Sequence, residues 1–185
     1  MPLSPSQRSQ LLRIARQSIE AALDGKSVPL DVSTLDPELQ RPSGAFVTLN
    51  GRDGDLRGCI GSILPVEPLY RAVAGNAVNA AFRDPRFLPL RNEELPGLTI
   101  EISVMSPIEE VHDVGEIEVG RDGLIIRRGN RAGLLLPQVA TEYGWDRDTF
   151  LSQTCVKAGL PPTAWRSGDC RIEKFSAEVF GEREA

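Results

Sequence analysis

An Asn-Gly pair between two apolar runs is the feature that most restricts the fold of this chain. Asn50-Gly51 follows the apolar run 45–49, and a second run extends from Leu56 to Ile60. Asn-Gly in this setting is a strong signal for an antiparallel β-hairpin. Residues 98–105 alternate between apolar and polar side chains, as in a strand with one buried face. These patterns favour an antiparallel sheet over a doubly wound parallel one.

Helical periodicity is the second clear pattern. Apolar residues recur at helical spacing over residues 11–23, after a serine (Ser4 or Ser6) that is placed to cap a helix, and Gly25 ends the run. A second helix is expected over residues 69–83. It is rich in alanine and glycine, so it should be able to approach a sheet closely.

The remaining elements are expected to be shorter. Residues 26–44 contain three prolines and are predicted to form a loop with at most one helical turn. The sequence GRDG occurs twice, and both copies are interpreted as turns between strands. Because helices and strands mix without a regular βαβ alternation, the predicted fold class is α+β. The other expected elements are a turn capped by Asn92, helices from Gln138 and Asp146, and strands at 116–119, 124–127, 134–136 and 170–180.

The composition is that of a globular protein that carries excess negative charge. Of 185 residues, 41% are hydrophobic and 25% are charged, and the net charge is −5. This charge disfavours nucleic acid and anionic membranes as partners. No apolar run approaches the roughly 20 residues of a membrane span, and the first residues lack the features of a signal peptide. We therefore expect a cytoplasmic protein.

Histidine and cysteine are scarce. The chain has one histidine, His112, and three cysteines without a CxxC pair, Cys59, Cys155 and Cys170. An odd number of separated cysteines is not a disulfide framework, and this set of residues forms no local group of metal ligands. We expect no bound metal and no cofactor.

Residues 56–61, LRGCIG, contain the groups best suited to bind a ligand or to react. Arg57 offers a fork of donors for a carboxylate or a phosphate. Gly58 and Gly61 enclose Cys59 and Ile60. The two glycines predict a turn whose backbone N–H groups, including that of Ile60, could form an anion-binding nest. Cys59 is the candidate catalytic residue. The alternative interpretation is a β-bulge that holds a buried cysteine.

A second candidate group follows the helix that ends near residue 83. Asp84 and Arg86, with Asn79, are expected to flank the same pocket as Arg57 and to bind a ligand there. The alternative is that Asp84-Pro85 only terminates the helix and that Arg86 is a solvated surface charge. Glu101 lies on the polar side of its predicted strand, where exposure is more common than catalysis.

Four segments in this order resemble the AMMECR domain family, also described as AmmeMemoRadiSam system protein A. The resemblance covers about residues 8–180 and implies a two-lobed α+β domain. Its sheet would be mainly antiparallel and flanked by helices, with a smaller subdomain and a cleft at LRGCIG. It also implies a Memo-type protein and a radical SAM protein as partners, but no activity. The segments are LRGCIG at 56–61, AAFRDPRFLPL at 80–90, EELPGLTIEISVMSPIEEV at 93–111 and LLLPQVATEYGWD at 134–146.

Two functional classes follow from these observations. In the first, the domain is a ligand-binding or accessory component that holds a small anionic ligand or the tail of a partner. In the second, it is a thiol-dependent enzyme or redox module that uses Cys59. A nucleic-acid-related regulatory role is a third alternative, which the net negative charge disfavours. The absence of a paired acid and base in the sequence favours the first class.

Overall fold

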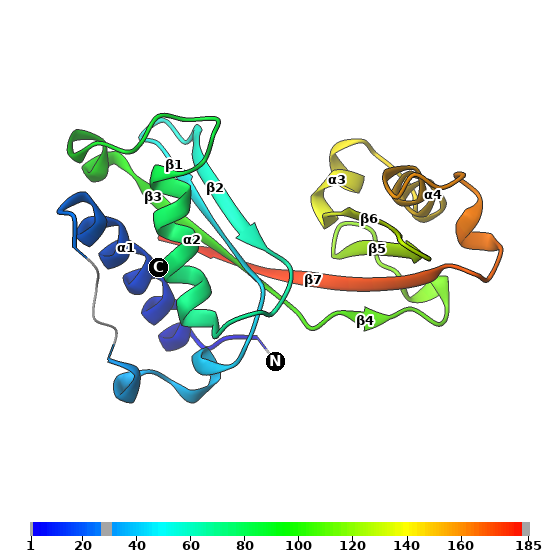
Figure 1. Cartoon of the computed structure of the whole chain (residues 1–185), viewed down its shortest axis with the longest axis horizontal. Coiled ribbons are helices and arrows are strands. Elements are labelled where there is room, and N and C mark those ends of the chain that lie inside the picture. The colour runs from blue at the N-terminus through cyan, green and yellow to red at the C-terminus, as the bar shows by residue number, and fades with distance from the viewer. Residues whose placement is uncertain (1, 27–30, 183–185) are drawn as a thin grey trace. The chain divides into compact units, whose positions relative to one another are not determined.

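The computed structural model describes residues 2–26 and 31–182 and divides the chain into two compact units (Figure 1). Unit 1 comprises Met1–Met105 and Glu178–Ala185, and unit 2 comprises Ser106–Ala177. The paired strands of both units are antiparallel. The predicted α+β class and antiparallel sheet are therefore confirmed. Within the described ranges, no helix combines the length and the apolar character that crossing a membrane requires.

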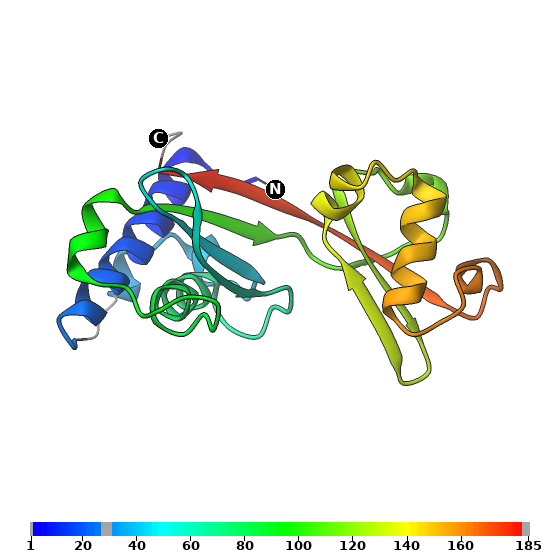
Figure 2. The same ribbon diagram turned by 90° about the horizontal axis from the view of Figure 1, so that it is seen from above.

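Unit 1 is a helix-covered antiparallel sheet. Its strands lie in the order β2 (Leu56–Ser62), β1 (Ala45–Asn50) and β3 (Thr99–Met105). Helices α1 (Pro5–Leu23) and α2 (Leu69–Phe82) pack on each other and on one face of this sheet (Figures 1 and 2). The hairpin predicted at Asn50-Gly51 joins β1 to β2, so this prediction is confirmed.

Local sequence explains where the helices of unit 1 begin and end. Ser4 caps α1 in a capping box with Gln7, and Pro5 occupies the first turn, where its missing N–H costs nothing. Gly25 follows the helix with a φ of 69°, a conformation that favours glycine. The buried face of α1 and the alanine-rich face of α2 close one hydrophobic core over the sheet.

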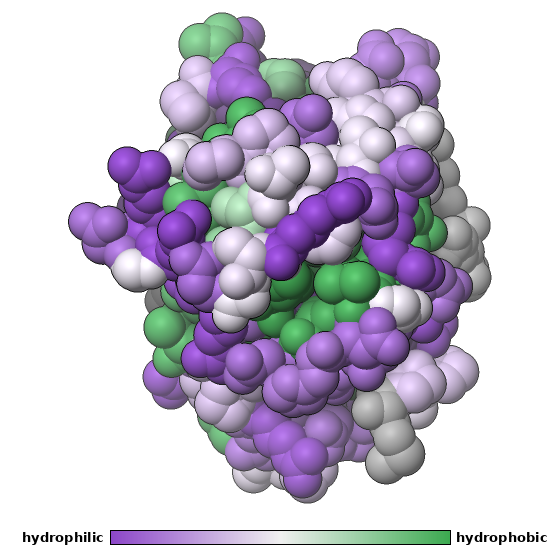
Figure 3. Space-filling model, turned by 90° about the vertical axis from the view of Figure 1, so that its right-hand side faces the viewer, coloured by the Kyte–Doolittle hydropathy of each residue, from purple (hydrophilic) through white to green (hydrophobic). Residues whose placement is uncertain are grey.

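Unit 2 is built around a second hairpin. Strand β5 (Asp122–Arg128) pairs with β6 (Arg131–Leu135) on one side and with β7 (Arg171–Gly181) on the other. β7 also pairs with the short strand β4 (Glu109–Glu110). Helix α3 (Pro137–Glu142) packs on β5, and α4 (Arg147–Lys157), capped by Asp146, packs on β5 and β6. Figure 3 faces the side of unit 2 and shows a mostly polar surface with a small central group of apolar side chains.

Three predicted elements differ from the structure. Residues 116–119 do not form a strand, because Glu116 ends a short 3-10 helix, Val114–Glu116, capped by Asp113, and a turn closed by hydrogen bonds to the carbonyl oxygen of Glu118 follows. The second GRDG, at 120–123, therefore does not lie between two strands. The loop 26–44 contains two 3-10 helices, Val32–Thr34 and Pro37–Gln40, rather than one turn. Pro29, one of its three prolines, lies outside the described residues.

The second strand of the hairpin, expected over Leu56–Ile60, is confirmed as β2, but the turn expected at residues 57–61 is wrong, because these residues lie inside that strand. Neither Gly58 nor Gly61 has a positive φ, so conformational freedom does not explain them. A Cβ on Gly58 would lie 2.2 Å from the carbonyl oxygen of Ala80 in α2, and one on Gly61 would lie 2.4 Å from that of Ala45. Glycine at both positions therefore allows close backbone packing.

Candidate functional site

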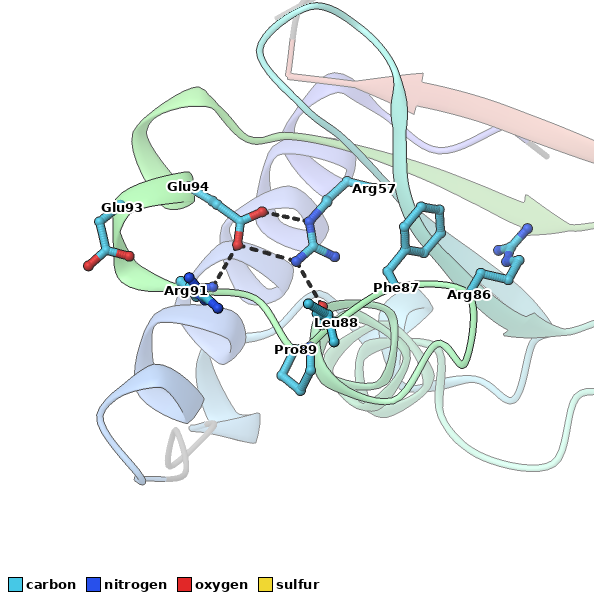
Figure 4. A pocket seen from close by; sticks show the side chains of 8 residues that line it. All are labelled: Arg57, Arg86, Phe87, Leu88, Pro89, Arg91, Glu93 and Glu94. Atoms are coloured by element: carbon cyan, nitrogen blue, oxygen red, sulfur yellow. Dashed lines mark hydrogen bonds and ion pairs between the residues drawn. The ribbon is translucent and has the colours of Figure 1, made fainter.

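An open depression in unit 1 gathers most of the charged groups that follow α2. Its volume is about 750 Å³. Arg57 reaches it from β2, whereas the other lining residues come from the segment between α2 and β3 (Figure 4). Residues 93 and 94 belong to the 3-10 helix η3 (Asn92–Gly97). The lining consists of Arg57, Arg86, Phe87, Leu88, Pro89, Arg91, Glu93 and Glu94.

Arg57 lies largely buried at this depression, and one of its nitrogens has no partner. Its Nε and Nη2 donate to the two carboxylate oxygens of Glu94 at 2.6 and 3.2 Å. Nη2 also donates to the carbonyl oxygen of Leu88 at 2.8 Å. The side chain is only 16% exposed, and its buried Nη1 finds no acceptor among the described residues. Buried donors are rarely left unpaired, because the lost hydration is not replaced.

The ring of Phe87 lies beside Arg57, on the side toward which the unpaired nitrogen points (Figure 4). The guanidinium carbon of Arg57 lies 5.8 Å from the centre of the Phe87 ring, and that of Arg86 lies 5.5 Å away. Figure 4 shows the ring between the two arginines. The ring thus interacts with two cations at once, and it separates Nη1 of Arg57 from Arg86.

Glu94 is held in place by three donors. Besides the two bonds from Arg57, it accepts the backbone N–H of Arg91 at 2.9 Å, and Arg91 rather than the expected Asn92 occupies the N-cap position of η3. The hydrogen bond from Arg57 lowers the pKa of Glu94, despite the opposing effect of burial. Glu94 therefore remains ionised at neutral pH and is occupied by Arg57. Glu93 and the side chain of Arg91 are exposed at the rim.

Asp84 accepts a hydrogen bond from the free edge of β2. Its buried carboxylate accepts the backbone N–H of Cys59 at 2.9 Å and the Nη2 and Nε of Arg86 at 2.7 and 3.0 Å. Nη2 of Arg86 also donates to the carbonyl oxygen of Cys59 at 3.3 Å. The hydrogen bond from the Arg86 side chain, followed by that from Cys59, holds the pKa of Asp84 far below its usual value.

The predicted anion-binding nest is therefore not present in this form. The N–H that points outward from the middle of the segment, that of Cys59, already binds the carboxylate of Asp84. Gly58 and Gly61 serve close packing, and Ile60 packs against the core of unit 1. Of the residues expected to bind a ligand, only Arg57 and Arg86 line the depression. Asp84 holds Arg86 in place through their ion pair.

Cys59 lies on the face of the sheet opposite the helices and does not line the depression. Thr48 is its cross-strand neighbour, and the Thr48 hydroxyl donates to the Cys59 sulfur at 3.3 Å. On its other side Thr48 faces Glu101 of β3, so sheet register places these three residues in one row. Sequence separation alone could not reveal this row. Burial raises the pKa of the other two thiols, Cys155 and Cys170.

The other residues considered from sequence have structural or surface positions. Asn76 donates to the carbonyl oxygen of Ala45 at 3.0 Å and ties α2 to β1. Asn79 accepts a long bond of 3.4 Å from Arg83, and neither residue lines the depression. His112 is exposed. In the described part of the chain, no three histidine, cysteine, aspartate or glutamate side chains are grouped so that they could hold a metal ion.

Six lining residues were not expected from sequence: Phe87, Leu88, Pro89, Arg91, Glu93 and Glu94. The first three directly follow Arg86, so proximity in sequence was a usable signal for them. The pairing of Glu94 with Arg57 spans 37 residues. It had no sequence signal, because Glu93-Glu94 also suits the first turn of a short helix.

Comparison with known proteins agrees with this fold. The family model AMMECR1 matches residues 12–180. A protein of Thermococcus gammatolerans is 47% identical, and the match covers 93% of this chain and 88% of the relative. A protein of Methanothermobacter thermautotrophicus is also 47% identical, over 98% of this chain and 97% of the relative. The crystal structure of uncharacterized protein PH0010 from Pyrococcus horikoshii superposes with a TM-score of 0.78 at 43% identity, covering 97% of this chain and 93% of that one.

Proposed function

This chain belongs to the AMMECR1 family, and we propose that it acts as a binding component that receives an acceptor group of a partner in the Arg57 depression. The buried, unpaired Nη1 of Arg57 is the observation that carries this proposal. A ligand oxygen would supply the missing hydrogen bond, and a bond to a charged donor contributes about 1.5–3 kcal/mol. The neighbouring Arg86 and Arg91 make the same region favourable for an anionic group.

The depression is poor in groups that transfer protons. Arginine stays protonated at any physiological pH, and three of the eight lining residues are arginines. Glu94 is held ionised by Arg57, as the lowered pKa of Glu94 indicates, and its oxygens are already occupied. A site with this lining can bind and orient a group, whereas general acid–base catalysis needs a residue that titrates near neutral pH.

The partners are proposed from family association. A Memo-type protein and a radical SAM protein are the candidates, and each would act as a separate chain. In this proposal the domain matched by the family model, residues 12–180, supplies the binding surface and the partner supplies the chemistry. We propose a cytoplasmic location for this complex, in accord with the composition of the chain.

Titration of the purified chain with each purified candidate partner by isothermal calorimetry tests this proposal. We expect a complex with one of them and no turnover by the chain alone. Arg57→Lys keeps a positive charge beside Glu94 but removes the guanidinium, so it should weaken the complex about tenfold or more.

The matched control is Arg83→Lys, which changes an exposed arginine outside the depression and should leave the affinity within about twofold. Equal affinity of the wild type and Arg57→Lys for the partner would contradict the proposal.

A second candidate function, thiol chemistry at Cys59, is favoured by the hydrogen bond from Thr48 to its sulfur. This hydrogen bond holds the sulfur in a fixed position beside the hydroxyl. The two proposals are separated by Cys59→Ser, which changes one atom outside the depression. Binding should survive this substitution. If the chain alone converts a substrate and Cys59→Ser abolishes this activity, the chain is a thiol-dependent enzyme instead.

A further inference from the structure

We infer that the group received by the Arg57 depression is the C-terminal end of a polypeptide, with a free carboxylate beside Arg57 and an apolar last side chain beside Leu88 and Pro89. This inference rests on the proposed function and names the chemistry of the occupant. It follows from three features of the depression: the mixed charge of its lining, the one unpaired nitrogen of Arg57 and its exposed apolar rim.

The charge of the lining has both signs. Three arginines face the depression, but so do the carboxylates of Glu93 and Glu94. A multiply charged anion such as phosphate would meet these carboxylates at short range and be repelled. The end of a peptide carries a carboxylate with only one charge, together with backbone N–H groups that can donate to Glu93. Peptide chemistry therefore matches this lining better than phosphate chemistry does.

The number of free donors also selects the ligand. Phosphate sites in proteins usually present several backbone N–H groups or a helix N-terminus. Here the outward N–H of Cys59 is already bound to Asp84. Two of the three nitrogens of the Arg57 guanidinium are bound to Glu94, so only Nη1 remains. One free nitrogen, with its two N–H groups in the plane of the guanidinium, suits one oxygen of a carboxylate, whose second oxygen can face the exposed Arg86 or Arg91.

Apolar side chains lie beside this donor. Leu88 is 74% exposed. Pro89 is also exposed, and Phe87 is half-buried. An apolar terminal side chain that covers Leu88 and Pro89 would bury surface that now faces water. The last residue of a protein chain carries a carboxylate and a side chain on the same Cα, and C-terminal carboxylates are a known target of peptide-binding proteins.

Nη1 is buried, so a neighbouring group must move before an oxygen can reach it. We propose that Phe87 moves, because its ring lies beside Arg57 on the side toward which this nitrogen points (Figure 4). The contact with Arg86 offers a place for the ring, since it already lies 5.5 Å from that guanidinium. The ring can give up its contact with Arg57 and keep the one with Arg86. The ligand carboxylate then replaces the ring beside Arg57, and the new hydrogen bond compensates for the lost cation–π contact.

Defined peptides test the inference. The probes are acetyl-Ala-Ala-Ala-Leu as the free acid, the same peptide as the C-terminal amide, acetyl-Ala-Ala-Ala-Ser as the free acid, and inorganic phosphate. Calorimetry on the full chain should show the leucine acid binding about tenfold more tightly than its amide and more tightly than phosphate. The acid ending in serine should bind about threefold less tightly than that ending in leucine, because it buries less apolar surface.

Variants assign these differences to the depression. Arg57→Lys should remove the preference for the acid over the amide, and Arg83→Lys should keep it. Leu88→Ser changes an exposed side chain, so the protein should fold normally, and it should remove the preference for leucine over serine.

Two outcomes separate this inference from the function on which it rests. If the partner complex depends on Arg57 but the amide or phosphate binds as tightly as the acid, the inference is wrong and the proposed function stands. If neither the partner complex nor any peptide depends on Arg57, both are wrong.

Discussion

Replacing Gly58 with alanine should lower the free energy of unfolding by about 3 kcal/mol or more. The added Cβ would lie 2.2 Å from the carbonyl oxygen of Ala80 and 3.0 Å from its carbonyl carbon. Both are backbone atoms of α2, so the clash cannot be relieved by rotating a side chain. The helix must move away from β2, and this movement loosens the packing beneath Arg57. Urea denaturation followed by circular dichroism measures the effect.

Gly75→Ala is the matched control for this prediction. Gly75 lies in the same helix, and a Cβ there would meet nothing within 4 Å. Alanine in place of glycine inside a helix stabilises a protein by about 0.5–1 kcal/mol. The same substitution should therefore have opposite signs at the two positions. A Gly58→Ala variant as stable as the wild type would show that β2 and α2 are not packed this closely.

Asp84→Asn should lower the midpoint of thermal unfolding by roughly 5–10 °C at neutral pH. Asparagine keeps the shape of the side chain but loses the charge that faces Arg86, and its amide N–H₂ opposes donors from Arg86 or Cys59. The carboxylate accepts four hydrogen bonds from these two residues. The substitution thus releases both the edge of β2 and the segment that carries Phe87.

The same effect should depend on pH with a definite sign. The pKa of Asp84 is lowered from an ordinary value of 3.8, mainly by Arg86, so its contribution to stability is fully present above about pH 4. As the pH falls below this value the contribution is lost progressively, and the wild type and Asp84→Asn should converge. Asp53→Asn, in the exposed hairpin turn, should show no such difference. A gap between wild type and Asp84→Asn that is independent of pH would contradict this account.

The fold could be predicted where local sequence decides the structure. Asn50-Gly51 determined the hairpin, and the small residues of α2 correctly indicated close packing on the sheet, which Gly58 permits. The strand expected at 116–119 was wrong because its short apolar pattern competes with the capping side chain of Asp113. Periodicity over so few residues does not decide between a strand and another conformation.

The candidate site was predictable only in part, because tertiary pairing completes it. Arg57 and Arg86 stood out by their chemistry, and both line the depression. Glu94 occupies two nitrogens of Arg57, 37 residues away in sequence. Asp84 occupies the N–H of Cys59, 25 residues away. The ion pair of Arg57 with Glu94 and the hydrogen bond from Cys59 to Asp84 change the interpretation of the segment. The five donors of Arg57 do not form an open anion site, since three of them are bound and only the two on Nη1 lack a partner among the described residues.

The most direct test of the central claim is to map where the partner touches this chain. The chain would be labelled with ¹⁵N and titrated with the unlabelled Memo-type or radical SAM protein, and the backbone and arginine side-chain resonances followed by NMR. The account predicts shifts concentrated at Arg57 and residues 86–94, with Arg83 and unit 2 unchanged. Shifts confined to unit 2, or to the row formed by Cys59, Thr48 and Glu101 with Arg57 unmoved, would contradict it.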